Sequence, residues 1–234
     1  RYIREANVKW SKRIERVIDV REKQNKIIHW PRNPFYLIVW NAAMDGSVPA
    51  YRDDSLTSIL TPEDITKMAS IESTVSVPNP DNPDDPYDLI QITVTETYSP
   101  SKIEKYRIME DWIFDYNYSD FRARIIAIAP LWRPLTESGL ELGEVPLYWL
   151  KMDDIREKLS QEEVFNSKNN AARMSFDHWF QTRQFSSYIV KESNPYDIDI
   201  AQFDEYKDDG VEALLKNDEI KNDLFILEHD LWEY

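Results

Sequence analysis

The residues best suited to chemistry in this chain are three carboxylates, Glu110, Asp111 and Asp115, which alternate with aromatic residues in the run EDWIFDY. A glycoside hydrolase requires two carboxylates in a cleft with stacking aromatic rings, and the chain holds 8 Trp and 13 Tyr. Aromatic residues at strand spacing more often fill a core, however, and acidic residues more often face water. We therefore predict no catalytic residues, and a carbohydrate-active or peptidoglycan-binding protein is the alternative function.

A nucleophile activated by histidine is not expected, nor is a metal or nucleotide site. His178 adjoins Asp177, but Ser186 and Ser187 follow eight and nine residues later, about 12 Å along a helix axis, which is beyond hydrogen-bond reach. The chain has three histidines, no cysteine and no HExxH pattern, so we predict no metal ligands. With four glycines it contains neither a P-loop nor a GxGxxG turn, so we predict no cofactor.

The composition excludes several classes of partner. A net charge of -15 argues against nucleic acid, whose phosphates require clustered Lys and Arg, and against an anionic membrane surface. No run approaches the roughly 18 apolar residues of a membrane-spanning helix, so we predict no membrane insertion. The 234 residues are 42% apolar and 13% aromatic, which is enough to bury a core and excludes disorder of the whole chain.

The stretch from Ser175 to Asn194 carries the strongest pattern, and we predict a helix there. Ser175 is suited to cap its N-terminus, and Asn194-Pro195 is suited to end it. Such a helix, at about 100° per residue, has apolar residues on two nearly opposite faces, with Phe176, Trp179 and Phe180 on one and Phe185, Tyr188 and Ile189 on the other. Either two elements of the chain cover this helix, or its second half faces a partner.

Eight residues are candidates for a partner interface: Phe185, Tyr188, Ile189, Lys191, Glu192, Asn194, Trp10 and Arg13. Lys191, Glu192 and Asn194 could present a charge pair and amide donors to another subunit; alternatively, the lysine complements the helix dipole and the asparagine caps the helix end. Trp10 and Arg13 belong to an amphipathic pattern from Asn7 to Asn25, which predicts a docking helix. For the three apolar candidates we favour an internal contact with a C-terminal stripe of Leu224, Leu227 and Leu231.

The remaining segments predict an α+β fold. Helices are expected at 35–44, ending at Asp45-Gly46, at 61–70, starting at Thr61-Pro62, at 153–164, and at 209–231, with a second cap at Asp218. Period-two alternation predicts strands near 90–94 and 106–114, and Val145, Leu147 and Trp149 suggest another at 145–149. The run at 121–129 predicts a further strand, which is expected at the centre because its end is apolar on both faces. The sequence thus predicts an antiparallel meander of about four strands in the middle of the chain, flanked by N-terminal and C-terminal helices, in a single domain spanning residues 1–234.

Residues 76–88, SVPNPDNPDDPYD, form the most unusual segment, with four prolines and four aspartates. Proline removes backbone donors and like charges repel, so regular structure is not expected there. We predict a projecting, proline-rich acidic loop over residues 76–87 that is dispensable for the fold.

Several segments resemble, in the same order, those of the GldN/PorN family of gliding-motility and type IX secretion proteins. The signature is the run RQFSSYIVKESN, followed by PYD and preceded by VFNSKNNAARMSFD. The likeness extends to the stretches VKWSKRIERVIDVREKQN, DWIFDYNYSDFRARIIAIAPLWRP and DGVEALLKNDEIKNDLFILEHDLWEY. The resemblance therefore covers nearly the whole chain.

This resemblance implies a non-enzymatic structural subunit of the secretion and gliding machinery. Members of the family assemble with the lipoprotein GldK/PorK into a large periplasmic ring under the outer membrane, and they contact the periplasmic part of GldM/PorM. The chain is accordingly expected to self-associate within a ring. It is also expected in the periplasm, bound to the outer membrane through the lipoprotein, as a mature chain after signal-peptide removal.

Overall fold

The computed structural model describes residues 3–78, 89–115, 117, 120–134, 143–165, 173–207 and 209–230. Within this part of the chain the fold is α+β, as predicted. An eight-stranded sheet has the order β12-β1-β6-β7-β9-β2-β3, with β8 also on β7, and its neighbouring strands are antiparallel. Its short strands are β2 (Ala50–Tyr51), β3 (Ile59–Leu60), β8 (Val145–Pro146) and β9 (Trp149–Lys151).

The centre of the sheet is the hairpin of β6 (Lys105–Asp115) and β7 (Asp120–Trp132). The period-two alternation predicts β6, the run that is apolar on both faces at its end predicts β7, and the central position of β7 is confirmed. Tyr106 and Ile108 are fully buried on one face of β6, and Met109 is buried on the other. Both faces of the hairpin are therefore covered by other parts of the chain.

β1 (Val8–Asp19) corrects the prediction of a docking helix between Asn7 and Asn25. Trp10, Ile14 and Ile18 are four residues apart, and this spacing places residues on one side of a strand as well as close to one side of a helix. β1 pairs with β6 along one edge and with β12 along the other. Residues 14–19 are all buried, because both faces of the strand are covered there.

The predicted helix from Ser175 to Asn194 is also wrong in its second half. α4 (Phe176–Gln181) starts as predicted, because the Ser175 Oγ accepts a hydrogen bond from the His178 backbone N–H at 3.2 Å. The chain then turns at Arg183, whose φ of 52° lies in the left-handed region, and β12 (Tyr188–Glu192) follows. The two opposite apolar faces therefore belong to two different elements.

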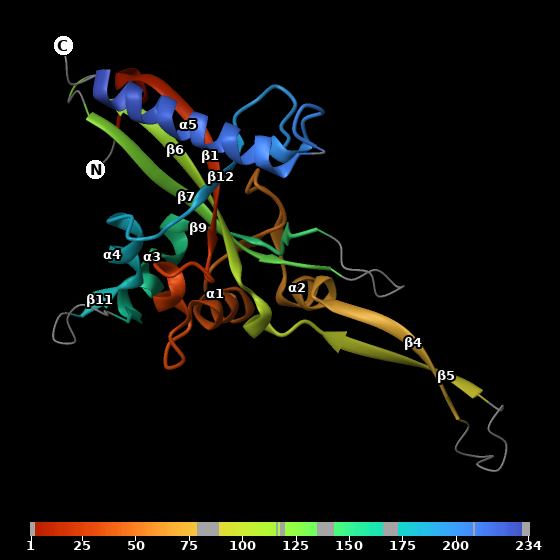
Figure 1. The fold of residues 1–234 in the computed structure, drawn as a ribbon. Coiled ribbons are helices and arrows are strands. Elements are labelled where there is room, and N and C mark those ends of the chain that lie inside the picture. The colour runs from red at the N-terminus through yellow and green to blue at the C-terminus, as the bar shows by residue number, and fades with distance from the viewer. Residues whose placement is uncertain are drawn as a thin grey trace.

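The predicted meander of about four strands is correct only for part of the sheet. β1 and β12 come from the two ends of the chain, where helices were expected, and the fourth predicted strand is split into β8 and β9. The strand predicted near residue 90 is β5 (Leu89–Thr97), which pairs with β4 (Ser70–Pro78) in a separate ribbon that extends away from the sheet (Figure 1). β4 includes residues 76–78 of the predicted acidic loop, and residues 79–87 lie outside the described residues.

Three predicted helices are confirmed as α1 (Phe35–Met44), α2 (Pro62–Met68) and α3 (Met152–Gln161). α1 ends before Gly46, whose φ of 69° suits a residue without a side chain. α2 begins with a capping box, in which Thr61 Oγ1 accepts from the Asp64 N–H and Asp64 Oδ2 accepts from the Thr61 N–H. A two-stranded ladder of β10 (Glu163–Val164) and β11 (Met174–Ser175) lies beside α3 and α4.

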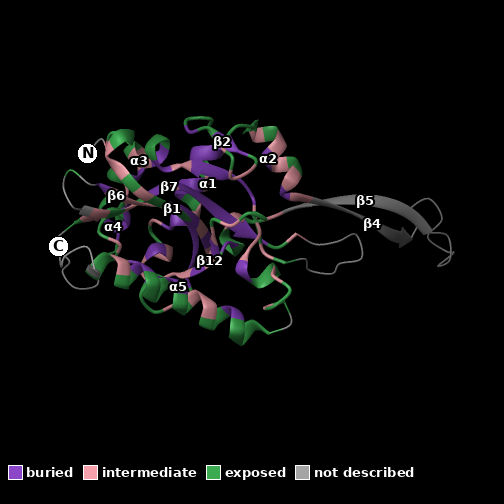
Figure 2. Cartoon of the chain, turned by 90° about the horizontal axis from the view of Figure 1, so that it is seen from above, coloured by how far each residue is buried: buried purple, intermediate pink, exposed green. Residues whose placement is uncertain are grey.

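The helices occupy two ends of the long strands (Figures 1 and 2). α1 to α4 contribute residues such as Phe35 and Trp179 to the larger apolar cluster, which includes Ile18 of β1. α5 (Gly210–Asp230) covers the other end, where Ile220 and Leu224 pack on Ile14 and Ile189. α5 is continuous, so the predicted second cap at residue 218 is wrong.

Candidate functional site

Glu110 and Asp111 of β6 do not form a catalytic pair, and the third carboxylate, Asp115, is buried and accepts a hydrogen bond from the Asn117 backbone N–H at 3.1 Å. Glu110 and Asp111 lie on opposite faces of the strand because they are consecutive. Glu110 is fully buried and pairs with Arg183 at 2.8 Å. Asp111 accepts two hydrogen bonds from Arg13, at 2.7 and 3.0 Å, on the other face. A glycoside hydrolase requires both carboxylates in one cleft, so this arrangement does not support hydrolysis.

The other groups considered for catalysis have structural partners. Ser187 Oγ accepts a hydrogen bond from Arg16 at 2.9 Å, and the Ser186 N–H donates to Asn25 Oδ1 at 2.9 Å. His29 lies 3.2 Å from the Tyr106 hydroxyl, and its burial lowers the pKa of its imidazole. The described residues contain no group of three or more His, Cys, Asp or Glu side chains that could hold a metal ion.

Three of the eight predicted interface residues are buried inside the chain. Phe185 packs in the larger apolar cluster, with its ring centroid 5.5 Å from that of Trp179. Ile189 packs beneath α5 with Leu224, so the expected internal contact is confirmed for this residue. Lys191 is buried as well, and Tyr188 is half-buried beside it on β12.

Three other predicted residues converge on one cavity, although they are far apart in the sequence. Trp10 of β1, Glu192 of β12 and Asn194 line a cavity of about 460 Å³ beneath α5. Lys12 pairs with Glu192 at its edge. The last predicted residue, Arg13, does not line this cavity, because its exposed side chain lies on the opposite face of β1 and pairs with Asp111, while its backbone N–H donates to Ser193 Oγ at 3.2 Å. The pairing of β1 with β12 is the cause of this convergence.

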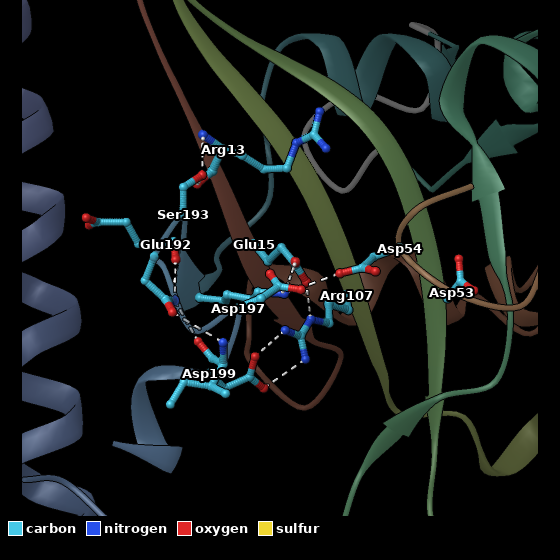
Figure 3. Close-up of polar contacts among 12 residues, drawn as sticks. Arg13, Glu15, Asp53, Asp54, Arg107, Glu192, Ser193, Asp197 and Asp199 are labelled. Carbon is cyan, nitrogen blue, oxygen red and sulfur yellow. Dashed lines mark hydrogen bonds and ion pairs between the residues drawn. The ribbon is translucent and has the colours of Figure 1, made fainter. Parts of the chain in front are cut away.

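An ion-pair cluster includes the buried residues Lys191 and Glu15 and the more exposed Asp54 and Asp197. Figure 3 shows Glu15, Asp54 and Asp197 together with Arg107. Lys191 Nζ lies 2.7 Å from Asp197, 3.2 Å from Asp54 and 3.4 Å from Glu15. Burial by itself lowers the pKa of Lys191, but the hydrogen bonds to Asp197 and Asp54 and the charge of Glu15 together raise it. Lys191 therefore keeps its charge in the folded chain.

Arg107 of β6 is the second cation of this cluster, and sequence reasoning missed it. Its guanidinium contacts Glu15 at 2.5 Å and donates two hydrogen bonds to Asp199, at 2.5 and 2.9 Å. Burial lowers the pKa of Arg107, and the bonds to Asp199 and Glu15 raise it by more. One sequence signal could have found this pair. Glu15 and Arg107 are charged residues within otherwise apolar stretches of β1 and β6, at positions that face inward.

Asn194 shapes the turn that brings the carboxylates to this cluster. Its Nδ2 donates to the backbone oxygens of Glu192 and Ile198, at 2.8 and 2.9 Å. Its Oδ1 accepts from the backbone N–H groups of Tyr196 and Ile198, and Asp197 adopts a φ of 56°. The signature run KESNPYD thus holds β12 against β1, and Asp199, two residues after the run, pairs with Arg107 of β6.

Comparison with known protein families identifies the family of this chain. The model of one family, described as gliding motility associated protein GldN, matches residues 3–233. The chain belongs to the GldN family. No curated protein matches the chain. As a member of the GldN family, the protein is a component of the gliding motility and type IX secretion machinery. The GldN family is not a known enzyme family.

The position of the signature run in this GldN family member agrees with a structural role. Its charged and amide side chains contact one another and the central strands of the sheet, as described above. In the described part of the chain, every helix is too short or too polar to cross a membrane.

Proposed function

We propose that this GldN family protein is a non-enzymatic structural subunit that assembles with the lipoprotein GldK/PorK into a periplasmic ring and contacts GldM/PorM. The observation that carries this proposal is the family match over residues 3–233, because it includes every element of the sheet rather than one motif. The pairing of Glu110 and Asp111 with arginines supports it, since neither carboxylate is available as a general acid or base. In this proposal the mature chain lies in the periplasm and is held at the outer membrane by the lipoprotein.

The candidate interface has two parts in this proposal. The exposed and half-buried residues Trp10, Arg13, Tyr188, Glu192 and Asn194 contact a partner, and the buried residues Phe185, Ile189 and Lys191 hold them in place. The ion-pair cluster supports this division, because it fixes β12 against β1 from the inside.

The test is capture of this chain by the tagged lipoprotein after co-expression. Arg13→Glu changes an exposed side chain and breaks its pair with Asp111, so we expect a small fall in melting temperature, similar to that of the control, and a large loss of capture. The matched control is Arg173→Glu, at an exposed position on the segment before β11. Failure of the wild-type chain to bind the lipoprotein would refute the proposal, and equal effects of the two variants would refute the interface.

A purified protein that hydrolyses peptidoglycan would refute the non-enzymatic part. Replacing Asp111 and Asp115 together by alanine distinguishes the two functions. A structural subunit retains secretion if the variant folds, whereas a hydrolase loses its activity.

A further inference from the structure

α5 carries apolar side chains on two opposite faces. Its inner face, Ala213, Ile220 and Leu224, packs against the sheet. Its outer face carries five large apolar side chains that are each more than half exposed: Val211, Leu214, Leu215, Phe225 and Ile226. Leu214 and Leu215 follow Val211 by three and four positions, and Asp218 lies seven positions after Val211 and seven before Phe225, so these residues follow one side of the helix. A soluble helix normally exposes its polar face, so this outer face is suited to an intermolecular contact.

The charge of α5 indicates the chemistry of its partner. Residues 210–230 include six acidic residues and two lysines, and one of these lysines already pairs with Glu219. Among the described residues, none forms an ion pair with Asp218, which lies in the middle of the outer face. An apolar surface edged with acidic residues requires a partner surface that is apolar and edged with Lys or Arg.

One surface of the same chain has this chemistry. A cavity of about 590 Å³ between β7, α3 and α4 is lined by four arginines and one aspartate: Arg122, Arg124, Arg156, Arg183 and Asp177. Ile125 and Phe180 are among its apolar residues. We name this surface the arginine cavity. Four arginines gather here although the chain has a net charge of -15, and the volume lies within the range of about 300–1,000 Å³ typical of binding clefts.

The arginines keep donors for a partner although each already has a contact. Arg124 makes one hydrogen bond, to Asp153, and Arg156 contacts Asp153 and Asp177. A guanidinium has five N–H donors, and the side chains of Arg124 and Arg156 are 52% and 43% exposed. No residue of α5 lines the arginine cavity, and the outer face of α5 is exposed, so the two surfaces do not meet within one copy.

We propose that the outer face of α5 docks into the arginine cavity of a second copy of this chain. This inference rests on the proposed role as an assembly subunit, and it adds the two surfaces through which copies contact one another. The outer face of α5 and the arginine cavity are different surfaces, and each copy of the chain has both. Depending on the rotation between copies, such a contact either closes as a reciprocal dimer or continues from copy to copy as a ring or filament.

The test uses cysteine crosslinking between two kinds of copy, because the natural chain has no cysteine. One copy carries Leu214→Cys on the outer face of α5, and the other, of different mass, carries Gln181→Cys at the rim of the arginine cavity. The control second copy carries Glu63→Cys at an exposed site on α2. With a short bismaleimide we expect a crosslinked product that contains one copy of each mass for Gln181→Cys, and only background for Glu63→Cys. We expect the same result for the purified chain and for its complex with the lipoprotein.

Charge exchange tests the chemistry of the contact. Asp218→Lys in the first copy or Arg124→Glu in the second should lower the crosslinking yield roughly tenfold or more, because like charges placed together in an interface are strongly unfavourable. Combining the two variants should restore much of the yield. Circular dichroism melting of each variant checks that the exposed substitutions leave the fold intact.

Two outcomes would overturn the inference. Equal yields for Gln181→Cys and Glu63→Cys, while the lipoprotein still captures the chain, would refute the self-contact and leave the proposed function standing. Loss of lipoprotein capture by Leu214→Glu, without a specific crosslink between copies, would assign the outer face of α5 to the lipoprotein instead. Failure of capture by the wild-type chain is the separate result that refutes the proposed function.

Discussion

At the scale of single residues, the least replaceable side chains are the buried charges at the centre of the sheet. Arg107 and Glu15 are almost fully buried, and Lys191 lies next to them. Removing one member of a buried ion pair leaves an uncompensated charge, which costs more than the pair contributes. These residues are therefore expected to matter for stability.

Arg107→Met should lower the free energy of unfolding by about 3–5 kcal/mol, because Glu15 loses its closest cation in a site shielded from water. The matched control is Arg173→Met, which breaks the exposed pair with Glu163 and should cost less than about 1 kcal/mol. Chemical denaturation measures both values. Equal effects of the two variants would contradict a buried cluster, and partial recovery in the double variant Arg107→Met, Glu15→Gln would confirm the cause.

His29 makes the stability of the fold depend on pH. Burial lowers the pKa of its imidazole from the ordinary value of 6.5, so below that pH the unfolded chain binds a proton that the folded chain resists. The unfolded state then binds more protons, and the free energy of unfolding falls as the pH decreases from 6.5 through the folded pKa.

His29→Gln should therefore reduce the slope of stability against pH between about 6.5 and 5, in the window fixed by the unfolded pKa of histidine. His178→Gln, at an exposed position, is the control for the removal of a histidine. Urea denaturation at a series of pH values gives the slope. An unchanged slope for His29→Gln would show that other groups cause the acid sensitivity.

At the scale of elements, the ribbon of β4 and β5 is the most independent part of the chain. Its strands pair only with each other, and the two ends meet where the Tyr98 N–H donates to the Ala69 carbonyl at 2.7 Å. A short linker can therefore join residue 69 to residue 98 without moving either. This element includes the segment that the sequence marked as dispensable.

Replacing residues 70–97 by a short Gly-Ser linker should leave the melting temperature within about 4 °C of the wild type, which corresponds to roughly 1 kcal/mol for a chain of this size. A variant in which only residues 79–88 are replaced serves as the milder control. Calorimetry or circular dichroism measures the change. A larger fall for the full replacement would mean that the ribbon stabilises the rest of the fold.

At the scale of the whole molecule, the two ends of the chain lie in one sheet. β1, near the N-terminus, lies between β6 from the middle of the chain and β12 from the C-terminal third. β1 therefore cannot complete its hydrogen bonding before β12 is present. This arrangement supports the proposal that residues 1–234 form a single domain.

A single domain should unfold in one cooperative transition, with tryptophan fluorescence and far-ultraviolet circular dichroism giving the same midpoint. A fragment that ends at residue 187 lacks β12 and α5, so it leaves Trp10 and Ile14 without cover and should lose the cooperative transition. The full chain measured in parallel is the reference. Separate midpoints for the two probes, or a cooperative fragment, would indicate two domains.

The sequence by itself determined the elements whose signals are local, and it determined the family. The start of α2 depends on Thr61 and Asp64, the start of α4 depends on Ser175, and the alternation of β6 and β7 repeats every two residues. Each signal acts within a few residues of the chain. The likeness in residue order is also a property of the sequence, and it is confirmed over residues 3–233.

Only the tertiary structure decided the segments at the two ends of the sheet. The four-residue spacing of Trp10, Ile14 and Ile18 fits a helix and a strand alike, so the partners β6 and β12, about 100 and 180 residues away, select the strand. The same pairing brings Trp10, Glu192 and Asn194 to one cavity and Lys191 to Glu15. Hydrogen bonding and burial between distant segments leave no local pattern, and for this physical reason the sequence could name these residues but could not place them.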